Sequence, residues 1–332
     1  MDVYGSRGRS RRSNERSRSR RSFVKSLTVG LAGALAPRGR GFAADGGARG
    51  AIDTHTHFYD PTRPQGVPWP GKDDALLYRP VLPGELVRLT RAEKVSGTIV
   101  VEASTWLEDN QWLLDLAARE PFIVGIVGRL DTNSDDFEKH LTRFARDRLF
   151  RGLRINHDEL QAALERPAQL DHLRLLADND LELDVNGGPT MPADVARLAR
   201  AIPSLRIVVN HAANLMIDGR RVPDEWLAGM RAAAAGERVY CKVSALVEGT
   251  RKTHGDAPAD VDFYRPVLDS LWNVFGADRL LYGSNWPVSE RAAPYATVYQ
   301  IAHAYFQQKG ERALEKFLRT NAIAAYRPVE RG

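Results

Sequence analysis

The chain has 332 residues, and its hydrophobic (43%) and charged (27%) fractions are those of an ordinary soluble globular protein. Its single cysteine, Cys241, excludes an internal disulfide and any zinc site built from several cysteines. The net charge is +5, but residues 1–44 carry +9, so the remainder carries −4 and is mildly acidic.

The first 44 residues have the layout of an export signal. A Ser/Arg-rich segment leads to Arg20, Arg21 and Phe23, and a short apolar run over residues 27–36 is followed by small residues. This order is typical of a signal peptide, and paired arginines before a phenylalanine resemble the twin-arginine type. The apolar run is too short to span a bilayer, and a basic nucleic-acid tail would need neither that run nor the small residues. We therefore predict an exported protein, periplasmic or extracellular, whose partner is the twin-arginine export machinery, with no nucleic-acid partner and no integral membrane span.

Residues 45–332 alternate short apolar segments with amphipathic ones. The predicted strands cover residues 51–55, 97–103, 122–130, 151–155, 181–186, 205–211, 238–246 and 279–287. The predicted helices cover residues 83–95, 107–120, 132–147, 171–180, 191–202, 223–236 and 263–276, with two closing helices over about 294–326. The strands are near-continuous runs of Ile, Val and Leu, as in parallel strands buried on both faces. Eight such units predict one closed (β/α)8 TIM-like barrel of the α/β class.

An open doubly wound sheet is the alternative fold. Such a sheet usually carries a glycine-rich phosphate loop after its first strand, and none is present here. The long polar and aromatic insert over residues 58–80 follows the first strand instead. In a barrel this insert lies on the catalytic face, so we predict that it forms a lid or a wall of the substrate site.

Polar residues recur at the carboxyl ends of the predicted strands, where such barrels carry their chemistry. In strand order they are His55 and His57, Glu102, Arg129 and Asp131, Arg154, Asp184 and Asn186, Asn210 and His211, Lys242 and Ser244, and finally Ser284, Asn285 and Trp286. Each alone has a structural alternative, such as a cap, a turn or an ion pair with a helix. Their convergence on one rim favours an active site.

The stretch "AIDTHTHFYD" places His55 and His57 two residues apart at the end of a strand. Side chains at this spacing point to the same face of a strand. Two adjacent imidazoles suit a metal ion or a reactive carbonyl held between them. The alternative is a surface turn with two solvated histidines.

Several stretches of the chain, taken together, resemble the amidohydrolase superfamily. They are "IDTHTHFYDP", "WLEDNQWLLDLA", "GLRI", "VVNHAAN", "CKVSALVE" and "LLYGSNWPVS", and they span residues 51 to about 325. The branch they resemble is that of the lactonases, of fuconolactonase, rhamnonolactonase and 2-pyrone-4,6-dicarboxylate lactonase type. The resemblance implies a barrel that opens a sugar lactone or similar cyclic ester with water. Some members of this branch use a divalent metal and some work without one.

The resemblance also implies roles for particular residues. The metal ligands would be His55, His57 and His211. By the same resemblance His55, His57, His211 and Asn285 would be catalytic, and Arg154 and Lys242 would bind substrate. From their residue types alone, we add Glu102 as a catalytic candidate and Tyr59, Trp106 and Trp286 as flat faces that can bind a sugar ring. Three imidazoles can hold one zinc ion, and zinc-bound water ionises near neutral pH, so we predict either a single-zinc site or a metal-free one.

Asn285 departs from the pattern, because the family usually has an aspartate at this position. A carboxylate can take a proton from water, whereas an amide cannot. Glu102, His211 and Asp53 are the candidate replacements for the base. A decarboxylase or hydratase of the same superfamily and a non-catalytic sugar-binding barrel remain as alternatives.

The other histidines are weaker candidates. His140, His157, His172 and His303 fall on predicted helices or loops without metal-ligand spacing, so we expect them to be packed or solvated. His254 lies in the loop after the seventh strand, from which it can reach the rim.

Overall fold

The computed structural model of the chain describes residues 50–331, so the predicted signal peptide lies outside the described residues. Eight parallel strands form one sheet in the order in which they occur along the chain. They are β1 (Ala51–Thr56), β2 (Val95–Val101), β3 (Ile123–Gly128), β4 (Phe150–Asn156), β5 (Glu182–Asn186), β6 (Arg206–Val209), β7 (Val239–Val243) and β8 (Leu280–Tyr282). The predicted (β/α)8 architecture is confirmed. The first residue of each strand lies within three residues of its predicted position, and the last residue lies within five.

Backbone contacts between the first and last strands close the barrel. The His57 amide donates to the Trp286 carbonyl oxygen at 2.9 Å, and the Asn285 amide donates to the His55 carbonyl oxygen at 2.8 Å. Asp53 reinforces this seam, because its Oδ1 accepts from the backbone amides of His55 (3.1 Å) and Ser284 (2.9 Å). The seam therefore fixes His55 of β1 and His57 just after it against the residues that follow β8.

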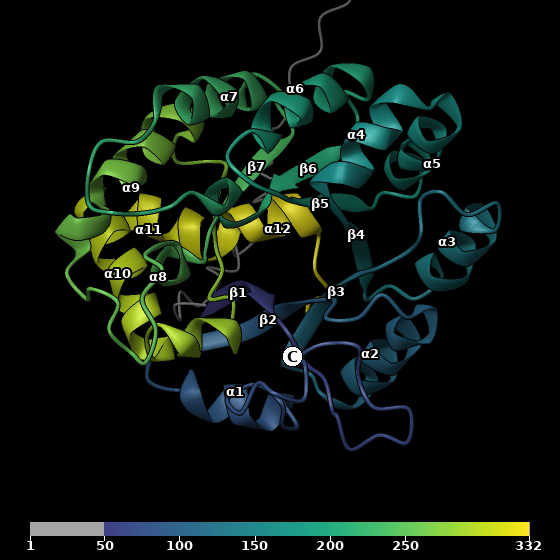
Figure 1. Cartoon of the computed structure of the whole chain (residues 1–332), viewed down its shortest axis with the longest axis horizontal. Coiled ribbons are helices and arrows are strands. Elements are labelled where there is room, and N and C mark those ends of the chain that lie inside the picture. Colours follow the sequence, from purple (N-terminus) through teal and green to yellow (C-terminus); the bar gives the residue numbers. More distant parts are fainter. Residues whose placement is uncertain (1–49, 332) are drawn as a thin grey trace, which may run out of the picture. The chain divides into compact units, whose positions relative to one another are not determined.

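The helices surround the strands (Figure 1). They are α1 (Pro83–Leu89), α2 (Leu107–Arg119), α3 (Phe137–Ala145), α4 (His157–Glu165), α5 (Pro167–Asp178), α6 (Met191–Ala201), α7 (Asp224–Ala234), α8 (Leu246–Gly249), α9 (Val261–Phe275), α10 (Tyr295–Gln308), α11 (Glu311–Glu315) and α12 (Asn321–Tyr326). Short 3-10 turns η1 (Asn210–Asn214) and η2 (Val288–Arg291) and a π-helical turn η3 (Lys316–Thr320) complete the chain. The sequence prediction missed α4, although Asn156 and Glu159 form a capping box at its start.

One end of the barrel is covered by α12, which lies over the strands in Figure 1. Its Ala325 carbonyl oxygen accepts from Arg206 Nε, at the start of β6, at 2.7 Å. Tyr326 packs with Ile52 and Ile99 in an apolar cluster inside the barrel. Because this end is covered at the starts of the strands, access to the barrel interior lies at the strands' carboxyl ends.

A second and larger apolar core lies between the strands and the surrounding helices. None of the helices in residues 50–331 is long and apolar enough to cross a lipid bilayer.

Candidate active site

A cavity of about 530 Å³ opens at the carboxyl ends of the strands, where the sequence predicts the active site. Every strand contributes to its lining at or just after its end. In the order β1 to β8 these residues are His57, Glu102, Arg129, Arg154, Asn186, His211, Ala245 and Asn285. Trp69 from the insert and Glu248 from α8 also line it. A volume of this size suits a small ligand such as one sugar ring.

The backbone turns left-handed within three residues of the ends of β6, β7 and β8. His211, Ala245 and Asn285 have φ angles of 56°, 51° and 60°. After β6 this conformation continues to Asn214, so four consecutive residues without a glycine are left-handed. Each such residue costs about 1–2 kcal/mol relative to a right-handed turn. Strain of this kind persists where the surrounding structure imposes it, and here it directs His211 and Asn285 into the cavity.

His57, Asn285 and Glu248 form a connected row of polar groups. His57 Nδ1 donates to the Val101 carbonyl oxygen at 2.9 Å, so the ring hydrogen lies on Nδ1. His57 Nε2 lies 3.3 Å from Asn285 Oδ1, and Asn285 Nδ2 donates to Glu248 Oε1 at 2.7 Å. Burial, reinforced by the nearby Arg154 charge, lowers the pKa of His57 to about 3, so the ring is neutral. Nε2 and Oδ1 are then two acceptors facing each other, and a hydrogen from water or substrate can satisfy both.

Glu248 was not predicted from the sequence. It follows the left-handed Ala245 on the four-residue helix α8, so it does not lie on a strand end. Burial raises the pKa of its carboxyl to about 7, and the hydrogen bond from Asn285 offsets only part of that effect. The one sequence signal is its place in the apolar stretch "SALVEG", where a lone carboxylate is expected to be exposed unless it has a function.

Lys242 lies beneath the cavity, not on its rim. It is fully buried, and its Nζ donates to Asp184 Oδ2 at 2.5 Å and to His55 Nδ1 at 3.1 Å. Tyr326 of α12 donates to the other oxygen of Asp184 at 2.7 Å. These four residues form a buried polar column from the covered end of the barrel to the site. Lys242 has no exposed surface and does not line the cavity, so its predicted contact with substrate stays a prediction that this placement does not support.

The structure brings the three predicted metal ligands close together. The His55 ring centroid lies 5.0 Å from that of His57 and 4.3 Å from that of His211. Within residues 50–331, no three His, Cys, Asp or Glu side chains are arranged to hold a metal ion. Because the Lys242 ammonium donates to His55 Nδ1, the ring hydrogen lies on Nε2, where a metal would need a lone pair. His55 Nε2 is buried without a partner, so it is a donor without an acceptor. The donor set does not fit a three-imidazole zinc site.

His211 reaches the cavity from the left-handed turn after β6. Its Nδ1 lies 2.8 Å from Ser244 Oγ, which fixes the ring orientation. Burial, reinforced by the charges of Lys242 and Arg154, holds its pKa well below the usual value, so this ring is neutral as well. A neutral imidazole at the mouth of the barrel can hydrogen-bond a carbonyl group or a water molecule.

Two arginines line the cavity beside β2, β3 and β4, and both are paired. Arg154 Nε donates to Glu102 Oε1 at 2.9 Å, and Arg129 forms an ion pair of 2.8 Å with Glu159. Burial raises the pKa of Glu102, an effect opposed by the positive charges of Arg154 and Arg129. Arg154 makes its contact with Glu102 through Nε, so its terminal nitrogens can serve a ligand.

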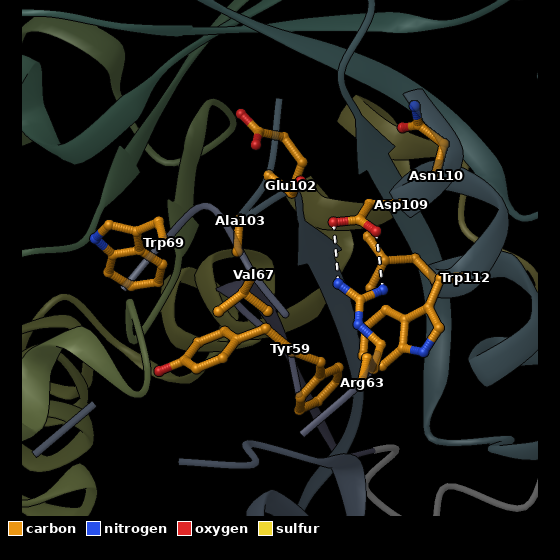
Figure 2. Close-up of a pocket in the computed structure, with 12 residues that line it drawn as sticks. Tyr59, Arg63, Val67, Trp69, Glu102, Ala103, Asp109, Asn110 and Trp112 are labelled. Carbon is orange, nitrogen blue, oxygen red and sulfur yellow. Dashed lines mark hydrogen bonds and ion pairs between the residues drawn. The ribbon is translucent and has the colours of Figure 1, made fainter. Parts of the chain in front are cut away.

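The insert after β1 forms a wall of the cavity and is tied to α2. Arg63 makes a bidentate ion pair with Asp109 at 2.8 and 3.2 Å and stacks 4.6 Å from the Trp112 ring centroid. Figure 2 shows this pair on one side of an adjoining small pocket, with Trp69 and Tyr59 on the other. The insert therefore brings Trp69 to the main cavity, as a substrate wall requires.

The three aromatic residues predicted to bind substrate do not line the main cavity. Tyr59 is buried and donates to the Leu77 carbonyl oxygen at 2.9 Å. Trp286 is fully buried and donates to Glu290 at 2.8 Å, whereas Trp106 is 38% exposed before α2. These placements do not support the predicted substrate contacts. The pattern of residues along the sequence does not show how deeply an aromatic ring will be buried.

The remaining rim residues have structural environments. Asp53 is buried in the β1–β8 seam, where Tyr295 also donates to it at 3.1 Å, and burial raises its pKa to about 6. Asn210 is fully buried, and Asp131 and His254 are exposed away from the cavity. His157, His172 and His303 contact Asp194, Phe137 and Tyr299, respectively. None of these residues lines the main cavity, so Asp53 is not placed to act as a base.

Comparisons with known proteins cover the whole barrel. Residues 52–327 match the model of the amidohydrolase family. An L-fucono-1,5-lactonase of Burkholderia ambifaria is 32% identical over 246 residues, which are 74% of this chain and 82% of that one. An L-fucono-1,5-lactonase of Burkholderia multivorans is 27% identical over 264 residues, covering 78% and 89% of the two chains. The crystal structure of an amidohydrolase from Burkholderia multivorans with bound zinc has a TM-score of 0.76 and 26% identity, covering 84% of this chain and 99% of that chain.

Proposed function

The chain belongs to the amidohydrolase family, and from this premise we propose that it is a hydrolase that opens a sugar lactone. One observation carries the proposal: the cavity holds two neutral imidazoles, His57 and His211, together with the cationic Arg154. Neutral ring nitrogens can hold a water or an ester carbonyl, and the guanidinium favours the negative charge that develops on the carbonyl oxygen. The two relatives named L-fucono-1,5-lactonase support a sugar lactone as the substrate class.

The remaining lining of the cavity suits a ring that carries several hydroxyl groups. Asn156, Asn186 and Asn214 contribute amides that both donate and accept hydrogen bonds. Asn214 Nδ2 is already held by Asn186 Oδ1 at 3.0 Å, so this pair is fixed in position before a ligand arrives. Trp69 adds a flat apolar surface against which one face of a sugar ring can pack. We propose that these groups select the hydroxylated ring and place its ester carbonyl near His57 and His211.

The reaction needs one bond to form and one to break. The water oxygen attacks the carbonyl carbon, the carbonyl π electrons move to oxygen, and a base takes a proton from the water. Collapse of the tetrahedral intermediate breaks the ring C–O bond, and the leaving oxygen takes that proton to give the hydroxy acid.

Zinc stays a prediction for this chain. A relative of known structure holds zinc, which supports a divalent metal in the family. In this chain, the hydrogen bond from Lys242 to His55 opposes a three-imidazole site. We therefore derive the reaction from the protein side chains alone.

Turnover of a lactone panel tests the proposal. L-Fucono-1,5-lactone and other sugar 1,5-lactones would be added to the purified protein, and acid release would be followed in a pH-stat against uncatalysed opening. We expect hydrolysis above background for at least one sugar lactone, and its loss in the double variant His57→Ala, His211→Ala. Release of carbon dioxide from aromatic carboxylic acids, or sugar-lactone binding without turnover, would replace the proposal with a decarboxylase or a binding protein, respectively.

We also propose that the protein is exported. Arg20 and Arg21 before the apolar run of residues 27–36 support this, although they lie outside the described residues. Cell fractionation should find a shortened product outside the cytoplasm. An uncleaved cytoplasmic product that does not change when both arginines are replaced by lysine would refute export.

A further inference from the structure

Only two carboxylates are among the residues that line the main cavity, Glu102 and Glu248. Arg154 contacts Glu102 at 2.9 Å, so that carboxylate is neutralised and occupied. Among residues 50–331, no ion pair joins Glu248 to a cation, and its environment is set by burial and by Asn285. A free carboxylate is the better proton acceptor, so the two carboxylates are not equivalent.

The position of Glu248 complements the missing charge at position 285. Asn285 Nδ2 donates to Glu248 Oε1 at 2.7 Å, so the carboxylate lies directly against the uncharged Asn285 amide. Oε2 is sealed from solvent and has no hydrogen-bond partner. Oε1 keeps a second lone pair, because a carboxylate oxygen can accept more than one hydrogen bond.

The other end of the Asn285 amide provides a place for water. Asn285 Oδ1 and His57 Nε2 are two acceptors 3.3 Å apart without a hydrogen between them. A water molecule that gives one hydrogen to this pair can give its other hydrogen to Glu248 Oε1. We propose that Glu248 is the general base of lactone hydrolysis and supplies the carboxylate that Asn285 lacks. This role rests on the proposed lactone hydrolysis.

The proton balance of the step is complete. As the water oxygen bonds to the carbonyl carbon, Glu248 takes one water proton and becomes a neutral carboxylic acid. When the ring C–O bond breaks, the same acid gives this proton to the leaving oxygen. Glu248 is then ionised again, and the product is the open-chain hydroxy acid, so no further reactant is needed.

The groups around Glu248 determine the pH dependence of this step. Tyr264 of α9 faces it, and the Glu248 charge contributes to a raised pKa of that phenol. Asn285 faces it from the end of β8, while His57 and His211 share the cavity and are neutral. The base must be ionised to act, so kcat/KM should rise with pH through about 7.

A carboxylate exchange tests the inference. The variants Glu248→Gln, Asn285→Asp and the double variant would be compared with wild type on the lactone turned over best in the panel. We expect Glu248→Gln to lower kcat/KM by about 10²- to 10⁴-fold and to abolish the acid limb of the pH profile. The double variant should recover at least about 10-fold over Glu248→Gln, because it moves the carboxylate to the neighbouring position. The control Glu290→Gln removes a half-buried carboxylate that does not line the cavity, so it should retain activity within about 2-fold.

The possible results separate this role from the proposed function. If the wild type hydrolyses a lactone and the kcat/KM of Glu248→Gln lies within about 3-fold of the wild-type value, the role of Glu248 is overturned while lactone hydrolysis stands. A large loss with an unchanged acid limb would also overturn it, since Glu248 would then only hold Asn285 in place. Absence of wild-type turnover on every lactone would refute the proposed function itself, and this role with it. Circular dichroism and thermal unfolding of each variant show whether a loss of activity reflects the site or the fold.

Discussion

The two sides of the cavity differ in the pairing of their charges and in their backbone conformation. The recognition side, defined by Glu102, Arg129 and Arg154, pairs its charges at 2.8–2.9 Å and follows extended strands. On the chemistry side, defined by His211, Glu248 and Asn285, no ion pair within residues 50–331 involves any of the three, and His211 and Asn285 have left-handed backbone. Paired charges hold fixed positions but react poorly, because their lone pairs are occupied. Unpaired and strained groups destabilise the fold but remain available for proton transfer.

Among the substitutions that distinguish the two sides of the cavity, loss of His211 should have the largest effect, and this effect is on kcat. His211→Ala removes a neutral imidazole from the chemistry side, so we expect kcat to fall by about 10³-fold while KM changes much less. Steady-state kinetics on the lactone from the panel would measure both. The matched control is His303→Ala, because His303 stacks on Tyr299 away from the cavity. Equal effects of the two substitutions would show that His211 acts only through packing.

The second effect concerns stability and should run opposite to activity. Burial raises the pKa of Glu248 from 4.5 to about 7, so the folded state binds this proton more tightly than the unfolded state. The folded state therefore loses stability as pH rises from about 4.5 through 7, by roughly 3 kcal/mol when fully ionised. Glu248→Gln should recover up to that amount at pH 8 and nothing below pH 4.5, as measured by urea unfolding.

Glu290→Gln serves as the control for this stability measurement. Glu290 accepts from Arg79 and from Trp286, so its charge is compensated and its removal should not stabilise the fold at pH 8. A gain for Glu248→Gln that is the same at both pH values would contradict the origin assigned to it.

A substitution on the recognition side should have a smaller effect, and it should change KM and not kcat. Arg154→Ala removes a guanidinium that lines the cavity, so KM should rise by about 10- to 100-fold, as expected for the loss of roughly 1.5–3 kcal/mol from a charged hydrogen bond. Arg143→Ala is the control, because Arg143 also pairs with a glutamate, Glu108, but does so on the exposed surface. An Arg154→Ala effect confined to kcat would place Arg154 in the chemistry and erase the distinction between the two sides.

Metal removal should have the smallest effect. The Lys242 ammonium occupies His55 Nδ1, so treatment with a chelator should change kcat/KM by less than about 2-fold. Elemental analysis before and after treatment would show whether any ion was present. Activity that disappears with the ion and returns in proportion to added zinc would restore the predicted zinc mechanism and require another arrangement of Lys242.

The sequence predicts the barrel and much of its rim, because both depend on local pattern. Apolar runs mark the strands, and polar residues at their ends include His57, Arg154, His211 and Asn285, all of which line the cavity. The burial of a side chain, in contrast, is not determined by the local sequence pattern. Lys242 was expected at the rim, yet it lies fully buried against Asp184 of β5, a strand that does not pair with β7, so only the folded barrel shows the contact.

Glu248 escaped prediction for a related reason. Its position depends on the left-handed Ala245, a residue that sequence patterns would not place in that conformation. The helix α4 was missed although Asn156 and Glu159 have the spacing of a capping box, so here the signal was present. Long-range contacts and unusual backbone conformations, in contrast, leave no periodic trace in the sequence.

The buried polar column has a consequence for the order of assembly during synthesis. Tyr326 belongs to α12, which follows all eight strands along the chain, yet its hydroxyl holds Asp184, which in turn holds Lys242 against His55. All strands can therefore leave the ribosome before the support beneath His55 exists. A nascent chain that has emerged only as far as β8 can collapse into a barrel, but it would contain Asp184 and Lys242 without their partner from α12. The support beneath His55 is thus complete only in the chain through α12.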